Sequence, residues 1–378
     1  MSYLIVEGGR KLKGRIVNQS AKNSAVAILC ATPLIHGRVT LSKVPRIEEV
    51  FRIVELLKSI GVKIEDDGRG TLIVDASAPL DLSGMDRAAA CRTRVSLLLF
   101  GSLAHREKNY RLYKSGGCKL GQRTVRPHLY ALENFGVNIV SRADFYEVRN
   151  DSLRAARIVM YESGDTATEN AILAAVLSPG VSEIKLASAN YQVQDLCYFL
   201  RTAGAKIDGI GTTTLRITGV ESLQPVKNYS IMPDPIVAMT YLAAGIVTGS
   251  TLTVSDCPLE FLELELYKLS KMGQKYNILN RRKSENGEFD IADVEIKPSK
   301  LTALEDKIEG RPFPGLNIDN LPLFVPILAM AKGRTLVHDW AFENRALYHL
   351  ELQKLGVRVT LLDPHRVWID GPTEFIHN

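Results

Sequence analysis

A short phrase built around glycine recurs through the 378-residue chain and constrains its fold more than any other feature. An apolar residue, a glycine, a small residue and a charged or polar residue follow one another in this phrase. It recurs at intervals of 68 to 83 residues, around Gly61, Gly136, Gly204, Gly273 and Gly356. A regular interval of this kind indicates a repeated structural unit. We therefore expect five similar units to cover nearly all of the chain.

A second glycine precedes most of these phrases by 23 or 24 residues, at Gly37, Gly180, Gly249 and Gly333. Glycine tolerates the left-handed turn that closes a helix, so an apolar helix such as residues 24–34 is expected to end near it. A β-rich run follows, and then a loop and an amphipathic helix such as residues 50–60. That amphipathic helix ends on the glycine of the recurring phrase, such as Gly61, and a strand pair completes the unit. The pattern predicts an α/β fold of repeated βαβαββ units.

Composition fits a soluble globular protein, with 46% hydrophobic and 24% charged residues, and the length suits two domains. The chain has no apolar run near the ~18 residues that span a bilayer. Residues 1–7 resemble a short strand and not a secretion signal. These features predict a cytoplasmic protein with no membrane partner. The net charge of +5 comes without a lysine and arginine tract, so we expect an anionic small substrate and no nucleic acid.

Cys118 lies in the longest strand-to-helix loop of the repeats, residues 113–123. Three glycines give this loop conformational freedom, and Lys114, Lys119 and Arg123 flank the thiol with positive charge. Positive neighbours lower the pKa of a thiol, which makes Cys118 a candidate nucleophile or acid. The alternative is a loop cysteine without a role. The other four cysteines read as reduced core residues, and no pair has metal-ligand spacing.

Further polar clusters precede apolar helices. Lys22 opens the first apolar helix and suits an anion site, although an ordinary capping turn explains it equally well. Arg92 and Arg94 stand at the head of another such helix and could bind carboxylate or phosphate, or simply face solvent. Asp319 precedes a third helix, where an acid is commonly an N-cap. Arg345 follows in a Phe-Glu-Asn-Arg stretch.

Taken in order, these segments resemble the UDP-N-acetylglucosamine enolpyruvyl transferases of the EPSP synthase-like superfamily. The matching motifs are Ala-Lys-Asn at 21–23, Arg-Val-Ser at 94–96, Gly-Gly-Cys-Lys-Leu-Gly-Gln-Arg at 116–123, His128, the Phe-Pro segment from 313 to Asp319, and Phe-Glu-Asn-Arg at 342–345. They extend from residue 1 to about residue 372. The shikimate-pathway relative is not favoured, because its Gly-Asn-Ala-Gly-Thr signature is absent.

The resemblance implies an inverse α/β barrel of two similar domains. Residues 21–224, with three units and the Cys118 loop, would form one domain. Residues 1–20 would join residues 225–378 in the other, with two complete units. The ligands would lie between the domains, with the loop closing as a lid. By this resemblance the family has six units, whereas five are found before Asn378. Three explanations stay open: the protein works without the sixth unit, another subunit supplies it, or the given chain is incomplete.

The implied reaction moves the enolpyruvyl group of phosphoenolpyruvate to the 3-hydroxyl of UDP-N-acetylglucosamine and releases phosphate, which is the first committed step of peptidoglycan precursor synthesis. It requires no metal or organic cofactor. The implied catalytic residues are Cys118, Asp319 and Lys22. Those implied for phosphoenolpyruvate are Lys22, Asn23 and Arg123, and those implied for the nucleotide sugar are Arg94, Arg123, Thr124, Val125, Asp319, Ala341 and Arg345. Fosfomycin is expected to alkylate Cys118. The oligomeric state is left open.

The chain departs from the family on the nucleotide side. The usual Ser-Val-Gly-Ala-Thr-Glu-Asn becomes Gly-Asp-Thr-Ala-Thr-Glu-Asn at 164–170, which adds Asp165. A charged Arg/Lys-Glu-Pro-Glu loop becomes Ala-Asn-Tyr-Gln at 189–192. The usual Arg-Pro-x-Asp-Leu-His also changes, with a base in place of an acid. An added carboxylate near a diphosphate is unfavourable unless it is paired.

These departures keep two other functions open. One is enolpyruvyl transfer to another uridine nucleotide, as in nucleoside antibiotic biosynthesis. The other is a catalytically weak paralogue that binds a nucleotide sugar. Retention of the matched lysine, arginine, cysteine and aspartate residues favours an active transferase.

Overall fold

The computed structural model describes residues 5–114 and 124–376. The chain divides into two compact units: Ser20–Met232, which we call the 20–232 unit, and Met1–Gln19 with Pro233–Asn378, which we call the 233–378 unit. This division falls shortly after the domain limit expected at residue 224. The reason is β12 (Val226–Ser230), which pairs in parallel with β2 (Arg38–Ser42) and so belongs to the 20–232 unit.

The described residues form five sheets, and four of them share one strand order, which confirms the βαβαββ repeat for those four. In a complete repeat the first two strands pair in parallel, and the last two form an antiparallel pair whose final strand lies beside the second. The third repeat shows this order with β8 (Arg157–Val159), β9 (Val181–Lys185), β11 (Thr214–Thr218) and β10 (Lys206–Asp208). The second repeat has three strands, without the parallel first strand.

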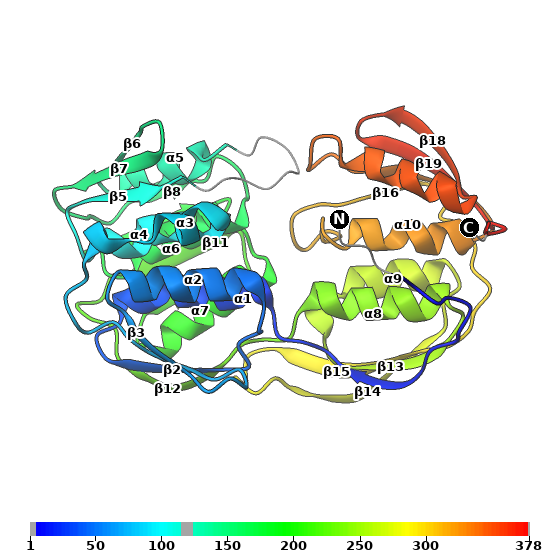
Figure 1. Ribbon diagram of the computed structural model, residues 1–378, viewed down its shortest axis with the longest axis horizontal. Helices are drawn as coiled ribbons and strands as arrows, with labels where there is room; N and C mark the ends of the chain where they lie inside the picture. Colours follow the sequence, from blue (N-terminus) through cyan, green and yellow to red (C-terminus); the bar gives the residue numbers. More distant parts are fainter. Residues whose placement is uncertain (1–4, 115–123, 377–378) are drawn as a thin grey trace. The chain divides into compact units, whose positions relative to one another are not determined.

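The 20–232 unit, blue to green in Figure 1, contains three repeats. Its first repeat consists of α1 (Lys22–Ala31), the 3₁₀ helix η1 (Thr32–Leu34), β2, α2 (Glu48–Ser59), β3 (Lys63–Asp66) and β4 (Leu72–Asp75). Its second consists of η2 (Leu82–Gly84), α3 (Arg87–Arg92), η3 (Arg94–Leu98), α4 (Leu99–Leu103), β5 (Asn109–Tyr113), α5 (Arg126–Asn134), β6 (Val137–Ser141) and β7 (Phe145–Asn150). Its third adds α6 (Asp165–Ala175) and α7 (Tyr191–Thr202) to the sheet given above.

The 233–378 unit contains two repeats within the described residues. One consists of β1 (Lys13–Val17), α8 (Pro235–Val247), β13 (Thr251–Pro258), η4 (Leu259–Phe261), α9 (Glu263–Lys271), β14 (Tyr276–Lys283) and β15 (Asp290–Ile296). The other consists of β16 (Lys307–Glu309), α10 (Leu321–Met330), β17 (Gly333–His338), η5 (Arg345–Leu355), β18 (Arg358–Asp363) and β19 (Arg366–Gly371). The expected strand at the N-terminus is wrong for residues 5–7, because the first strand is β1, whose backbone pairs with β13.

The repeated glycines adopt the backbone conformation for which the sequence pattern selects them. Those that end the second helix of each repeat have φ between 88° and 97°, at Gly61, Gly136, Gly204, Gly273 and Gly356. The preceding set, which comes before a strand, also has positive φ, from 58° to 128°. A side chain is disfavoured in this region, so glycine is the residue that allows each helix to turn into the next strand.

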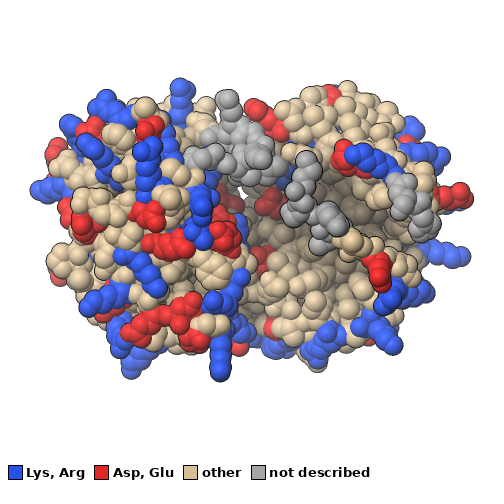
Figure 2. All heavy atoms as spheres, viewed as in Figure 1, with Lys and Arg blue, Asp and Glu red and all other residues tan. Residues whose placement is uncertain are grey.

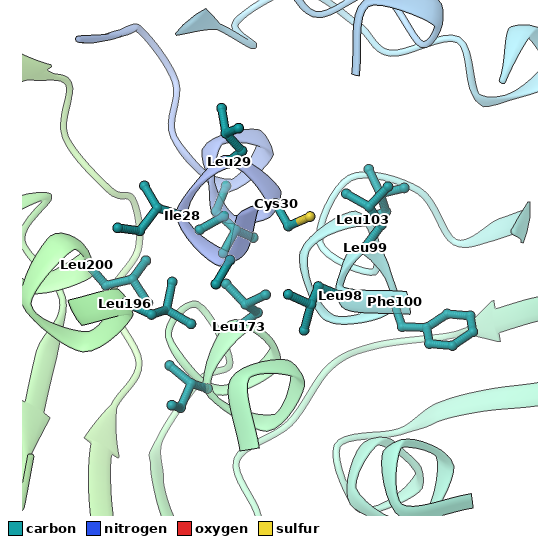
Figure 3. Close-up of a cluster of buried hydrophobic side chains, with 14 of the residues drawn as sticks. Ile28, Leu29, Cys30, Leu98, Leu99, Phe100, Leu103, Leu173, Leu196 and Leu200 are labelled. Atoms are coloured by element: carbon teal, nitrogen blue, oxygen red, sulfur yellow. The ribbon is translucent and has the colours of Figure 1, made fainter. Parts of the chain in front are cut away.

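The inner helices of the 20–232 unit are buried on all sides. Residues 24–31 of α1 and 167–175 of α6 are all buried, and the buried part of α6 includes the polar residues Thr168, Glu169 and Asn170. Figure 3 shows Ile28 of α1, Leu99 of α4, Leu173 of α6 and Leu196 of α7 in one cluster. A second cluster forms the core of the 233–378 unit. Closure of the repeats into an inverse barrel remains a prediction.

Two expected helices differ in the structure. The segment around Arg92 is not one helix, because α3 ends at Arg92 and Thr93 then begins a new 3₁₀ turn. The Thr93 hydroxyl accepts a hydrogen bond from the Val95 N–H at 3.2 Å, which caps that turn. The expected amphipathic helix after Arg345 is the 3₁₀ helix η5.

Candidate active site

Four helical segments of the 20–232 unit begin at or beside residues that the sequence marks for function. They are α1 at Lys22, η3 at Arg94, α6 at Asp165 and α7 at Tyr191. Backbone N–H groups at a helix start attract anions. Side-chain hydrogen bonds and ion pairs join these segments to one another, so residues from all three repeats contribute to one polar region.

Glu49, in the first turn of α2, joins Lys22 to the start of η3. Lys22 Nζ lies 2.5 Å from Glu49 Oε2, and the Thr93 hydroxyl donates to Glu49 Oε1 at 3.2 Å. Both ends of the ion pair remain partly exposed. The ammonium of Lys22 is therefore held in one place while part of it faces solvent, as an anion-binding cation requires.

Arg94 joins η3 to the segment that follows residue 123. Its guanidinium donates to the Thr124 carbonyl oxygen at 3.0 Å. Val125 is the N-cap residue of α5, and Thr124 Oγ1 accepts from the Arg126 N–H at 3.2 Å. The structure thus brings together Arg94, Thr124 and Val125, which the sequence assigns to the nucleotide sugar by resemblance.

His128 connects α5 to α6 as a neutral ring. Its Nδ1 lies 2.8 Å from Asn170 Nδ2, and its Nε2 lies 3.4 Å from the Thr166 hydroxyl. Burial, and secondarily the charge of Arg94, lower the pKa of His128 to about 3. The uncharged ring accepts the Asn170 amide proton and fixes the start of α5 against α6.

Asp165 is the acceptor for the loop that leads into α7. Ser188 Oγ donates to it at 2.5 Å, Asn190 Nδ2 at 3.1 Å and Gln192 Nε2 at 2.7 Å. The carboxylate that the sequence adds to this stretch is therefore paired with polar donors. Paired in this way, its negative charge is stabilised where it lies.

Asn23, the residue after Lys22, contacts the start of α7. Its Nδ2 donates to the Tyr191 hydroxyl at 2.9 Å, and the Tyr191 side chain is almost completely buried. The Lys22–Asn23 pair is thus held by residues from two other elements, Glu49 of α2 and Tyr191 of α7.

Glu169 is a buried acid in α6, next to this region. Within residues 5–114 and 124–376 no hydrogen-bond partner reaches its Oε1 atom. Burial, and secondarily the charge of Asp165, raise the pKa of Glu169 well above its usual value. The charged form of Glu169 is therefore disfavoured at this buried position between the helices.

The 233–378 unit carries the remaining candidate residues on two neighbouring segments. Arg345 contacts the buried carboxylate of Asp339 through Nε and NH2, and its NH1 lies 3.4 Å from Asp319 Oδ1. The guanidinium stacks on Phe342, with 4.2 Å between Cζ and the ring centroid. Ala341 lies in the same turn, partly buried. Asp319 keeps an exposed carboxylate, 46% accessible.

The interpretation of Asp319 as the N-cap of its helix is wrong. Asn320 occupies the N-cap position of α10, and its Nδ2 donates to the buried Glu265 at 2.8 Å. The Asp319 N–H donates instead to Asn317 Oδ1 at 2.9 Å, in the turn before the helix. The Asp319 side chain is therefore available to Arg345 and to solvent.

Cys118 and Arg123 lie outside the described residues. The other four thiols are free, and Cys30, Cys197 and Cys257 are buried. Burial raises the pKa of all three, to about 12 for Cys257, so these thiols are inert. Cys91 is only partly buried.

The surface and the polar clusters limit other kinds of site. Figure 2 shows basic and acidic side chains interspersed over the visible face of the 20–232 unit. No group of three or more His, Cys, Asp or Glu side chains placed to hold a metal ion occurs in residues 5–114 and 124–376. Across the same described ranges, no helix is both long enough and apolar enough to span a bilayer.

The sequence analysis did not identify the residues that hold the candidate binding side chains in place. Glu49 contacts Lys22, and Thr93 contacts Glu49 in turn. Tyr191 contacts Asn23, and Asp339 contacts Arg345. Glu49 is separated from Lys22 by 27 residues and Tyr191 from Asn23 by 168. Only the repeat offers a signal, because it predicts that equivalent helices begin on the same side of the unit.

Comparison with known proteins gives a family over nearly the full length. A family model described as EPSP synthase (3-phosphoshikimate 1-carboxyvinyltransferase) matches residues 6–374. A UDP-N-acetylglucosamine 1-carboxyvinyltransferase of Desulfatibacillum aliphaticivorans is 32% identical, covering 96% of this chain and 83% of the relative. One of Bradyrhizobium diazoefficiens is 33% identical, covering 98% and 84%.

Solved structures share the fold. The enolpyruvyl transferase NikO from Streptomyces tendae matches with a TM-score of 0.84 and 24% identity, covering 98% of this chain and 84% of that chain. An EPSP synthase from Acinetobacter baumannii matches with a TM-score of 0.74 and 18% identity, covering 98% of this chain and 84% of that chain. At these identities the likeness establishes the α/β fold alone.

Proposed function

Because the chain belongs to the EPSP synthase family, and within it to the UDP-N-acetylglucosamine 1-carboxyvinyltransferases, we propose that it transfers the enolpyruvyl group of phosphoenolpyruvate to the 3-hydroxyl of UDP-N-acetylglucosamine. The observation that carries this proposal is 32–33% identity, over nearly the whole chain, to relatives named for that activity. The product enters peptidoglycan precursor synthesis.

The reaction has two steps whose charges suit the described residues. A proton adds to the methylene carbon of phosphoenolpyruvate while the sugar oxygen bonds to C2 and loses its own proton. The tetrahedral intermediate then loses phosphate and a methyl proton to form the enol ether. Fixed cations stabilise the negative charge that develops and departs. Lys22, held by Glu49, takes this role at the start of α1.

Asp319 is our candidate for the base that accepts the hydroxyl proton. Its carboxylate is exposed and lies near Arg345, whose orientation the buried Asp339 fixes. Asn23 binds phosphoenolpyruvate beside Lys22, and Arg94, Thr124, Val125 and Ala341 bind the nucleotide sugar. Cys118 supplies the proton to phosphoenolpyruvate, and Arg123 contacts both substrates. These roles are carried over from the family by matching motif.

The test is phosphate release from phosphoenolpyruvate, with and without UDP-N-acetylglucosamine, by the wild type and by Cys118→Ala. We expect release that requires the sugar nucleotide and falls sharply in the variant. A folded wild type that binds both substrates and releases no phosphate would identify a nucleotide-sugar-binding paralogue.

Fosfomycin gives an independent measurement on the same residue. We expect the intact mass of the wild type to rise by one fosfomycin adduct, and that of Cys118→Ala to stay unchanged. An unmodified wild type after prolonged treatment would contradict the role of Cys118.

A second acceptor, another uridine nucleotide such as uridine monophosphate, is favoured by one observation. Asp165 places a paired carboxylate in the first turn of α6, within the stretch that departs from the family on the nucleotide side. A carboxylate repels a phosphate less as the distance between them grows, so an acceptor that keeps its phosphate farther from the start of α6 is favoured. Replacing UDP-N-acetylglucosamine with uridine monophosphate in the same assay decides between the two acceptors.

We also infer a cytoplasmic location. The described cysteines are all free thiols, which agrees with a reducing compartment. Export of a fusion to an oxidising compartment, followed by thiol counting, tests whether the fold tolerates oxidation there.

A further inference from the structure

Two departures from the family pattern meet in the structure. Asp165 is an added acid in α6, and the loop before α7 has Asn190 and Gln192 where the family has acids. Both amides donate hydrogen bonds to the Asp165 carboxylate, at 3.1 and 2.7 Å. Carboxylates at 190 and 192 would repel Asp165 at this distance, whereas amides bind it. The two changes compensate for each other.

The contacts with Asp165 fix the backbone at the start of α7. Asn190 is the N-cap of this helix, and its Oδ1 accepts from the Tyr191 N–H at 2.9 Å. The Asn190 N–H donates in turn to Ser188 Oγ, at 3.2 Å, and that hydroxyl donates to Asp165. Asp165 therefore holds the residues on both sides of Tyr191.

Tyr191 connects the fixed start of α7 to Asn23, the residue proposed to bind phosphoenolpyruvate. Its ring is 1% exposed, so the hydroxyl has little freedom to move. The hydroxyl accepts from Asn23 Nδ2 at 2.9 Å, which turns the nitrogen of that amide toward Tyr191. Asn23 follows Lys22 directly at the start of α1.

We propose that Tyr191 is a positioning residue for Asn23, and that Asp165 holds Tyr191 in place through the loop at 188–192. The inference rests on the proposed function, in which Asn23 binds phosphoenolpyruvate. Binding groups act best when neighbouring contacts fix their geometry before the ligand arrives. This chain thus uses its altered loop to orient a residue of the phosphoenolpyruvate site.

The direct test is Tyr191→Phe, which removes the hydroxyl and keeps the ring. We expect kcat/KM for phosphoenolpyruvate to fall about 3- to 10-fold, the loss for one hydrogen bond to a neutral partner. The KM for the sugar nucleotide stays unchanged. The matched control is Tyr110→Phe, because Tyr110 is also buried and its hydroxyl donates to the Phe100 carbonyl at 2.9 Å in the second repeat. The control retains wild-type kinetics.

A double-mutant cycle separates positioning from a general loss of structure. Equilibrium binding of phosphoenolpyruvate is measured by calorimetry for the wild type, Tyr191→Phe, Asn23→Ala and the double variant. If Tyr191 acts through Asn23, Tyr191→Phe has no further effect once Asn23 is alanine. Additive effects, or wild-type binding by Tyr191→Phe, overturn the inference.

Asp165→Asn extends the double-mutant cycle to the carboxylate that holds the 188–192 loop. We expect weaker phosphoenolpyruvate binding, by less than Tyr191→Phe causes, and no additional loss when the two are combined. A wild type that binds phosphoenolpyruvate but releases no phosphate contradicts the proposed function and leaves the binding cycle decisive. A wild type that does not bind phosphoenolpyruvate at all overturns both proposals.

Discussion

Glu49 fixes the ammonium of Lys22 and the hydroxyl of Thr93 at the same time. Replacing it with glutamine keeps the size of the side chain and removes the charge that holds Lys22. We expect Glu49→Gln to lower kcat/KM for phosphoenolpyruvate by about 10-fold, as for loss of a charge-assisted hydrogen bond of about 1.5 kcal/mol or more. Steady-state kinetics with varied phosphoenolpyruvate measure it.

The control for this variant lies on the same helix. Glu55 forms an ion pair with Arg52 at 2.5 Å on α2, whereas Lys22 pairs with Glu49. Glu55→Gln should retain wild-type kinetics. An equal loss in both variants would mean that α2 itself is disturbed, and would remove the argument for Glu49.

His128 should make the protein less stable in acid. Its pKa is about 3 in the folded protein, against 6.5 for an unperturbed histidine, so the unfolded chain binds the proton first as pH falls. Its contribution is complete above pH 6.5 and is lost on acidification toward pH 3, at about 1.4 kcal/mol per pH unit. Urea unfolding of the wild type and of His128→Asn at about pH 7.5 and 5.5 measures the difference.

The variant should show a pH dependence smaller by about 1.4 kcal/mol between these conditions. His36→Asn changes an exposed histidine and serves as the control. If His128→Asn unfolds too readily to compare, the ring resonances of wild-type His128 give its titration directly. A midpoint near the ordinary histidine value of 6.5 in the folded protein would contradict the burial argument.

At this scale the sequence predicted residue types better than residue partners. Lys22, Arg94 and Arg345 could be chosen because cations beside helix starts attract anions, and each proves to be held by defined partners. Their partners come from other elements and have no local signature. The cap prediction for Asp319 is wrong because the helix begins one residue later, with Asn320 at the N-cap position and no side-chain capping hydrogen bond there.

The turn at the end of α7 depends on the absence of a side chain. Gly204 has a φ of 97°, and the nearest atom to an added Cβ is Gln224 Cγ at 3.9 Å, so space is available and only the backbone conformation resists substitution. We expect Gly204→Ala to lower the free energy of unfolding by about 1 to 2 kcal/mol, the cost of a left-handed backbone for an L-residue.

Gly204→Asn is the matched variant, because asparagine tolerates positive φ better than alanine does. It should lose less stability than Gly204→Ala in urea unfolding. Equal losses would show that crowding and not backbone conformation sets the requirement. The same comparison at Gly273 would test whether the rule holds in the 233–378 unit.

The sequence predicted the types of the helices and strands better than their boundaries, and it did not predict which distant strands pair with each other. The glycine pairs mark where helices end, because only glycine readily adopts positive φ there. The pattern could not show that β12 completes the first sheet or that β1 completes the fourth, since parallel pairing leaves no sequence signature in either strand. Thr93 breaks the helix after Arg92 through a side-chain cap that propensity alone does not reveal.

At the scale of the whole molecule, residues 13–17 stabilise a unit whose other residues lie beyond 232. Besides its backbone pairing with β13, β1 brings Arg15 to the buried carboxylate of Asp293. We expect deletion of residues 1–19 to raise amide hydrogen exchange in β13 and β15 and to leave the 20–232 unit nearly unchanged. Hydrogen-exchange mass spectrometry on the full-length and shortened proteins measures this.

Arg15→Met tests the charge apart from the strand, because it keeps β1 and removes one of the two arginines that contact Asp293. Arg282 also contacts Asp293, so a smaller rise in exchange is expected than for the deletion. Uniform protection in all three proteins would show that β1 adds nothing to the second core.

The pairing of β1 with β13 also sets an order of events during synthesis on the ribosome. Lys13 cannot pair until its β13 partner, Thr251, has been synthesised, 238 residues later. At about 5–20 residues per second this delay is roughly 12 to 48 s. Every sheet of the 20–232 unit can be completed within that time. Residues 13–17 are therefore made before the 20–232 unit but can pair with β13 only after it, and until then they are exposed to chaperones and proteases.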